Sequence, residues 1–214
     1  MATLARRTIA VYAALGWKSE LYVRLRLLTA PLIETARYFP ARARILDLGC
    51  GHGIFAHILH QGSPERQVIG GDLMADRIAA AVKTLPADGR LRFSVGDARG
   101  FPAGPFDVIA CIDLLHHMPK PEQEELLRLI AGALPADGLL VIKELEKRPA
   151  WKYLYHYAQD WVSYRFRPLF FRSREEMTLL LQRLGFSTEI HSLASGRPYP
   201  HVVYLARWKA GASA

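Results

Sequence analysis

Residues 45–53 of this 214-residue chain read Ile-Leu-Asp-Leu-Gly-Cys-Gly-His-Gly, and this stretch constrains the fold most strongly. A short apolar strand pattern ends there and runs directly into three glycines, after which residues 54–60 follow a helical pattern. Strand, glycine loop and helix in this order are typical of a nucleotide-type cofactor site, because glycine lets the backbone turn sharply and approach a ligand. The sequence therefore predicts such a site at Gly49, Gly51 and Gly53.

Strand and helix patterns alternate around this loop. The strand patterns cover residues 44–48, 67–72, 91–95, 106–112 and 139–144, and the helical patterns between them cover 54–61, 75–85 and 122–134. Helical patterns also cover 3–14, 18–38, 150–164 and 174–184, and a closing strand pair is expected at 186–193 and 202–208. Pro31 is expected to kink or break the helix over 18–38. The alternation predicts an α/β fold, a Rossmann-like doubly wound and mostly parallel sheet with helices on both faces. The carboxyl ends of its parallel strands share one edge, where ligands bind.

Acidic side chains mark this edge. Aspartates stand at or just past the strand ends, at Asp47, Asp72, Asp97 and Asp113. Asp72 is suited to accept hydrogen bonds from both hydroxyls of a ribose, and Asp97 from an adenine amino group. Leu73 or Met74 could then pack on one face of the adenine and Ala98 on the other. Together with the glycine loop, these residues predict a nucleoside site.

Asp47 indicates which nucleoside, because a carboxylate there would repel a pyrophosphate and attract a cation. S-Adenosylmethionine carries an ammonium and a sulfonium and no phosphate, so it is the predicted cofactor, with Cys50 among the loop residues around it. An NAD-dependent oxidoreductase is a weaker alternative. Its fingerprint needs a glycine where this chain has Ile54.

These residues resemble the class I S-adenosylmethionine-dependent methyltransferases of the small-molecule type, similar to the ubiquinone/menaquinone methyltransferase group. The matching segments are residues 45–53, Asp72, Gly96-Asp97, Phe106 to Ile109, Asp113 to Met118 and Leu139 to Glu144. The resemblance implies a seven-stranded sheet with an antiparallel last strand and S-adenosylhomocysteine as product. It also implies that Asp47 and the glycine loop hold the methionine end. We expect one domain over 1–214: a helical cap (1–43), a cofactor-binding core (44–145), an acceptor-side cap (146–174) and a last helix with a strand pair (175–214).

Methyl transfer to a hydroxyl needs a group that removes a proton, and His116 and His117 follow the fourth strand. Either could act as the general base, since histidine titrates near neutral pH, and a purely structural role is the alternative. Lys143 ends the fifth strand and is expected either to line the acceptor pocket or to form an ordinary ion pair.

The two cap segments are rich in aromatic and basic residues. The residues predicted to contact the acceptor are Trp17, Tyr22, Lys143, Trp151, Tyr155 and Arg172. In the second helical pattern, Leu21, Leu25, Leu28 and Leu32 recur at helical spacing, with most charged residues off that stripe. We expect an acceptor that is hydrophobic or aromatic with an anionic end: quinone-like, a polyketide or fatty-acyl aromatic, or lipid-linked. A core role for the aromatic residues is the alternative.

The net charge of +8 is concentrated in residues 1–44 and 143–174, which each carry eight Lys and Arg. This predicts either a solvated basic face or contact with an anionic membrane or lipid-linked substrate. No metal site and no nucleic-acid partner are expected, although an RNA methyltransferase and a non-catalytic S-adenosylmethionine-binding module remain alternatives. Two cysteines and no leader or membrane span in the sequence favour a cytoplasmic protein, with a peripheral position at the inner face of a membrane left open. The oligomeric state is open.

Overall fold

The computed structural model describes residues 2–100, 104–145, 168–193 and 201–209. By its internal contacts the chain forms two compact units, Met1–Ala110 and Cys111–Ala214. Such units need not fold independently, so the single domain predicted over residues 1–214, with its four segments, stays a prediction. The helix expected at 150–164 lies outside the described residues.

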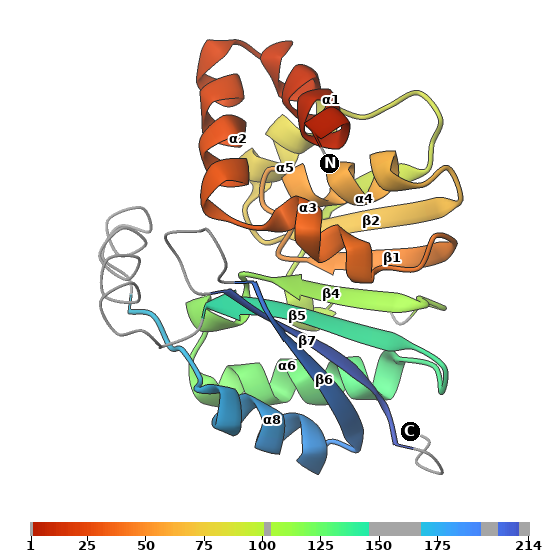
Figure 1. The fold of residues 1–214 in the computed structure, drawn as a ribbon, viewed down its shortest axis with the longest axis vertical. Coiled ribbons are helices and arrows are strands. Elements are labelled where there is room, and N and C mark those ends of the chain that lie inside the picture. Colours follow the sequence, from red (N-terminus) through yellow and green to blue (C-terminus); the bar gives the residue numbers. More distant parts are fainter. Residues whose placement is uncertain (1, 101–103, 146–167, 194–200, 210–214) are drawn as a thin grey trace. The chain divides into compact units, whose positions relative to one another are not determined.

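The first unit carries the glycine loop between a group of N-terminal helices and a set of parallel strands (Figure 1). Its elements are α1 (Ala2–Ala13), α2 (Trp17–Thr29), α3 (Leu32–Thr35), η1 (Ala36–Tyr38), β1 (Ala43–Leu48), α4 (Ile54–Gly62), β2 (Arg66–Asp72), α5 (Ala75–Val82), β3 (Leu91–Val95) and η2 (Ala98–Gly100). β2 pairs in parallel with both β1 and β3, and α4 and α5 contact β2 and β3. The register aligns Asp47 with Gly70 and Asp72 with Val95. Asp47 and Asp72 therefore lie near the carboxyl ends of adjacent strands.

The second unit contains the end of the fourth strand and the antiparallel strands. Its elements are η3 (Leu115–His117), α6 (Lys120–Ala133), β5 (Leu139–Leu145), α8 (Arg174–Arg183), β6 (Phe186–Ser192) and β7 (His201–Trp208), after β4 (Val108–Ile112), which spans the unit boundary. β7 pairs antiparallel with both β5 and β6. α8 begins with a capping box in which Ser173 and Glu176 satisfy each other's backbone N–H groups.

Among the described residues, seven strands follow the order β3-β2-β1-β4-β5-β7-β6. This confirms the predicted α/β class with a mostly parallel sheet and antiparallel last strands. β4 and β5 are buried at every position, as expected of strands covered on both faces. No helix within the described ranges is both long enough and apolar enough to cross a membrane.

The helical pattern over residues 18–38 is not one continuous helix, and the break falls at Pro31, the residue expected to kink or break it. α2 ends at Thr29, and Ala30 is extended with φ −115° and ψ 134°, because the ring of Pro31 disfavours a helical residue before it. The leucine stripe of α2 also faces solvent, and Val23 is the buried residue of this helix. Helical spacing identifies side chains that share a face, but it does not specify which face is covered.

Candidate functional site

The glycine loop between β1 and α4 has a backbone that only glycine adopts easily. Gly49, Gly51 and Gly53 have φ values of 70°, 55° and 79°. A Cβ on Gly53 would also lie 2.4 Å from the ring of Phe93. The loop is tied to the next strand, because the N–H groups of residues 49 and 50 donate to the carbonyl of Gly71 at 2.7 and 3.0 Å. The chain therefore presents a tightly turned loop at the carboxyl end of β1.

Asp72 is hydrogen-bonded to this loop from the end of β2. Its carboxylate accepts from the N–H of Gly51 and from the N–H of Met74, both at 2.8 Å. Each carboxylate oxygen has a second lone pair with which to accept from a ligand hydroxyl. Leu73 and Met74 follow it with exposed side chains. Asp72 thus fixes the glycine loop, a role that its sequence position did not reveal.

Asp47 is buried beneath the loop, and its Oδ2 atom has no hydrogen-bond partner among the described residues. Burial, reinforced by the charge of Asp72, raises the pKa of Asp47 to about 8. Burying a carboxyl oxygen without a hydrogen-bond partner costs free energy, and a nearby cation would compensate that cost. This fits the positively charged methionine end of S-adenosylmethionine and does not fit a pyrophosphate. Cys50, next in the loop, is half-buried, and burial raises the pKa of its thiol.

Asp97 lies after β3 and is engaged by a residue that the sequence analysis did not consider. Arg99 donates its backbone N–H and Nε to Oδ1, and its Nη2 to Oδ2, at 2.8 to 3.1 Å. These side-chain and backbone hydrogen bonds lower the pKa of Asp97. Ala98, which lies between these two residues, begins the short η2 helix. The Asp-Ala-Arg spacing was the available signal for this pair.

The N-terminal helices contact the glycine loop through His52. The Tyr12 hydroxyl of α1 donates to the His52 carbonyl at 2.7 Å, and the Tyr22 ring of α2 meets the His52 ring edge-on at 5.1 Å. Burial, with the charge of Arg77 adding to it, lowers the pKa of His52. Trp17 is exposed at the start of α2. The sequence gives no signal for the pairing of Tyr12 with His52, because this contact joins segments 40 residues apart.

In the second unit, Asp113 and Lys143 form a buried ion pair. Lys143 Nζ donates to both carboxylate oxygens at 2.7 Å, and the lysine side chain is completely buried. Asp113 has a left-handed backbone with φ 52°, which is uncommon outside glycine. Of the two alternatives for Lys143, the ion pair is therefore present, and it engages the carboxylate of Asp113.

His116 is held by Glu144, the neighbour of Lys143 on β5. Its Nδ1 lies 2.5 Å from Glu144 Oε2, and Glu144 Oε1 accepts from the Leu115 N–H at 2.9 Å. The carboxylate acceptor assigns the ring hydrogen to Nδ1. The His116 ring also stacks on Phe171 at 4.6 Å and lies 4.1 Å from the His117 ring. His116 is buried, whereas His117 is half-buried.

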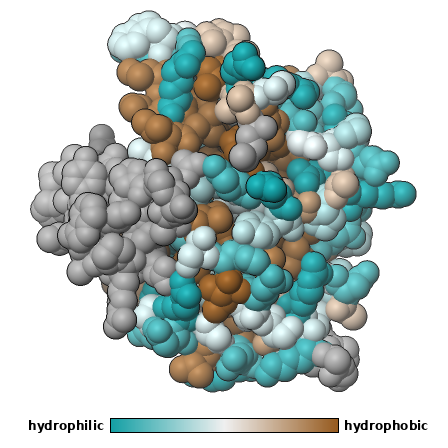
Figure 2. All heavy atoms as spheres, in the orientation of Figure 1, coloured by the Kyte–Doolittle hydropathy of each residue, from teal (hydrophilic) through white to brown (hydrophobic). Residues whose placement is uncertain are grey.

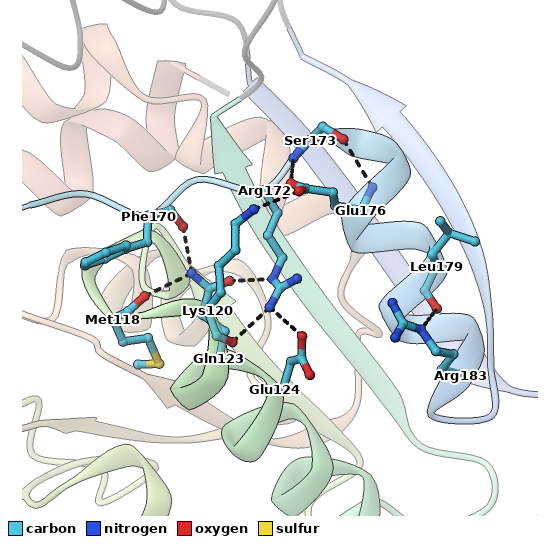
Figure 3. A network of polar contacts seen from close by, with 10 residues as sticks. All are labelled: Met118, Lys120, Gln123, Glu124, Phe170, Arg172, Ser173, Glu176, Leu179 and Arg183. Atoms are coloured by element: carbon cyan, nitrogen blue, oxygen red, sulfur yellow. Dashed lines mark hydrogen bonds and ion pairs between the residues drawn. The ribbon is translucent and has the colours of Figure 1, made fainter.

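Arg172 joins the segment before α8 to α6 (Figure 3). Its Nε donates to Gln123 Oε1 at 2.8 Å, and its Nη2 donates to the Lys120 carbonyl and to Glu124 Oε1 at 2.8 and 2.9 Å. Gln123 in turn donates to the Phe170 carbonyl at 2.7 Å. The guanidinium therefore has a structural role, and its predicted contact with an acceptor stays a prediction. Trp151 and Tyr155, also predicted to contact the acceptor, lie outside the described residues.

The glycine loop, its acidic neighbours and the strand order together define the fold class of the class I S-adenosylmethionine-dependent methyltransferases. A family model for the methyltransferase domain matches residues 20–190. The chain therefore belongs to the methyltransferase domain family, which confirms the class predicted from the sequence.

Relatives with assigned names include small-molecule enzymes. The ubiquinone biosynthesis O-methyltransferase of Xanthomonas axonopodis pv. citri (strain 306) is 32% identical over 121 residues, which cover 54% of this chain and 48% of that protein. The protein of the same name from Xanthomonas oryzae pv. oryzae (strain PXO99A) is 31% identical over the same shares of the two chains. The match spans about half the length of these relatives.

Solved structures share the fold at lower identity. Magnesium protoporphyrin IX methyltransferase from Synechocystis PCC 6803, with bound SAH, has a TM-score of 0.66 at 20% identity, covering 83% of this chain and 82% of that chain. An O-methyltransferase family protein from Burkholderia thailandensis has a TM-score of 0.71 at 22% identity, covering 88% and 57%. These likenesses support the fold.

Proposed function

We propose that this chain transfers the methyl group of S-adenosylmethionine to a hydroxyl of a small, hydrophobic or aromatic acceptor with an anionic end. The buried carboxyl of Asp47, which lacks a hydrogen-bond partner for Oδ2 among the described residues, carries the cofactor part of this proposal. A positively charged ligand that donates a hydrogen bond would compensate that group. When bound, S-adenosylmethionine supplies an electrophilic methyl group on its sulfonium.

The residues proposed to hold the cofactor belong to the first unit. Asp47 and the glycine loop, Gly49 to Gly53 with Cys50, would hold the methionine end, and Asp72 would accept from the ribose hydroxyls. Asp97, Leu73, Met74 and Ala98 would surround the adenine. Asp113 was predicted to contact the cofactor too. Its pairing with Lys143 favours a positioning role for this residue in the loop after β4.

His117 is proposed as the general base that removes the hydroxyl proton. Its half-buried ring is better suited to meet an acceptor than the buried ring of His116, which packs between Phe171 and His117. His116 and Glu144 are then positioning residues, since the hydrogen bond between them fixes the ring against which His117 lies.

The names of the Xanthomonas relatives support oxygen as the methylated atom. The excess of basic residues in the two cap segments supports an anionic end on the acceptor, and the aromatic residues of the same segments support an apolar body. Quinone-like compounds, polyketide or fatty-acyl aromatics and lipid-linked compounds share this chemistry.

Two measurements test the proposal. Calorimetric titration should detect binding of S-adenosylhomocysteine and no binding of NADH, and the reverse result would assign an oxidoreductase. Metabolite profiling of a deletion strain should then reveal an accumulated compound that is one methylene unit lighter than the product found in the parent strain. If the cofactor binds but the profiles of the two strains are identical, the non-catalytic binding module is favoured.

A further inference from the structure

α2 exposes an apolar face formed by Trp17, Leu21, Leu25 and Leu28. The relative exposures of these side chains are 70%, 47%, 52% and 68%, and their spacing of four, four and three places them on one side of the helix. Figure 2 shows hydrophobic residues gathered over this helix. Val23, on the other side of α2, is completely buried and fixes which side faces outward. An exposed set of large apolar side chains of this kind marks an interaction surface.

Basic residues are in excess on α2 and on α1, the helix that contacts it. Residues 2–29 contain five Lys and Arg and one acidic residue, which gives a net charge of +4. The exposed basic side chains are Arg6, Arg7, Lys18 and Arg24. Arg24 is paired with the single acid, Glu20, at 2.7 Å. A tryptophan, a leucine stripe and flanking basic residues on one short helix are typical of helices that lie in the interface of an anionic bilayer.

Charge complementarity favours an anionic bilayer over a second copy of the chain as the partner of this α2 face. In a two-fold dimer through α2, the basic residues of both copies would meet one another, and like charges repel. An anionic bilayer supplies negative headgroups for the basic residues and acyl chains for the leucines. α2 has 13 residues, so it is about 20 Å long, enough to lie along a surface but too short to span one.

We propose that the α2 face binds the surface of a bilayer that contains anionic lipids. This inference is independent of the proposed methyl transfer, because vesicle binding requires neither cofactor nor acceptor. It has one consequence for the first unit. Tyr22, on the same helix, contacts His52 of the glycine loop, so the membrane-facing helix would also contact the loop proposed to hold the cofactor.

Flotation with vesicles tests the proposal on the full chain. Vesicles with about 30 mol% phosphatidylglycerol should bind the protein, and pure phosphatidylcholine vesicles or high salt should weaken binding strongly. Leu21→Ser combined with Leu25→Ser should weaken vesicle binding by about tenfold or more, because each substitution removes a leucine that would be buried in the bilayer interface. A matched control combines Leu129→Ser with Leu179→Ser, two leucines that are 48% and 54% exposed on α6 and α8 and should not affect binding.

Far-UV circular dichroism should show that the test variant has the same helix content as the parent chain at the temperature of the assay, since the replaced side chains are about half exposed. A second readout compares the tryptophan emission of the parent with that of Trp17→Phe. On anionic vesicles the emission of the parent should shift further to shorter wavelength than that of the variant, because only the parent has Trp17. Equal vesicle binding by the test and control variants would overturn the proposal. So would a dimer, detected by sedimentation velocity, that the test variant converts to a monomer while no protein floats with vesicles.

Discussion

Lys143 donates hydrogen bonds to both carboxylate oxygens of Asp113 at 2.7 Å from a side chain that is completely buried. The main chains are joined as well, since the Asp113 N–H donates to the Lys143 carbonyl at 2.8 Å. The next residue of β5, Glu144, accepts from the Leu115 N–H and from His116. Two consecutive residues of one strand therefore fix the loop that carries both histidines.

Lys143→Met should destabilise the protein by about 3–5 kcal/mol, because it leaves a buried carboxylate without its partner. Urea unfolding at neutral pH measures this. Lys143→Met combined with Asp113→Asn should recover much of the loss, because the amide carries no charge and asparagine tolerates the left-handed backbone. If Lys143→Met lowers the free energy of unfolding by less than about 1 kcal/mol, the ion pair contributes little to stability.

Binding of S-adenosylhomocysteine, whose ammonium is retained, should release a proton from Asp47. The pKa of Asp47 is raised to about 8 in the free protein, and a bound cation would lower it. Affinity should therefore rise with pH from about 6 to about 8, by at most tenfold per unit. Calorimetry in buffers of different ionisation enthalpy measures the proton directly. Asp47→Asn should abolish the release, and a release that persists in this variant would assign the proton to another group.

The same carboxyl should make the ligand-free protein less stable as pH rises. Its folded pKa of about 8 exceeds the ordinary value of 3.8, so the folded state binds more protons between these values. Stability is then greatest below about pH 4 for this group and is lost as pH rises through about 8. Thermal melts of the parent chain and of Asp47→Asn across this pH range isolate the contribution of Asp47 to stability. If the melting temperatures of both proteins change in parallel with pH, Asp47 does not make this contribution.

His117→Gln should lower kcat by about 10²- to 10⁴-fold if His117 removes the acceptor proton. Glu144→Gln should lower kcat less and should move the midpoint of the pH–rate profile to lower pH, because a nearby negative charge favours a protonated imidazole. Steady-state kinetics on the identified acceptor measure both effects. If His116→Gln lowers kcat more than His117→Gln does, His116 is the general base and His117 the positioning residue.

Tyr12→Phe should weaken binding of S-adenosylhomocysteine by about 1 kcal/mol, roughly fivefold, because it removes the hydrogen bond that holds the His52 carbonyl in the glycine loop. Tyr22→Phe is the matched control, since it keeps the edge-on ring contact with His52. Equal affinities of the two variants would show that the Tyr12 hydroxyl does not support the loop.

The cofactor half of the molecule could be predicted because its signals are local. The glycines at 49, 51 and 53 adopt positive φ within one turn, and each aspartate lies within two residues of the end of its own strand. The strand alternation likewise predicted the sheet, and the break in the helical pattern at Pro31 follows from the residue type alone.

The contacts among distant segments required the tertiary structure. Lys143 meets Asp113 across 30 residues, and Arg172 meets Gln123 across 49, so no spacing rule connects them. Arg172 had the residue type of an anion-binding group, yet its hydrogen bonds go to α6 and stabilise the chain beside His116. Residue type and charge indicate what a side chain can bind, but not whether its hydrogen-bonding groups already bind other residues of the protein.

By itself, the sequence determined the fold class, the glycine loop and the charge of the ligand it favours, because these depend on backbone freedom and on residues adjacent along the chain. Only the tertiary structure decided which side of α2 is buried and which oxygen of Asp47 lacks a partner. It also decided which charged side chains neutralise one another. These depend on packing between segments that the sequence order keeps apart.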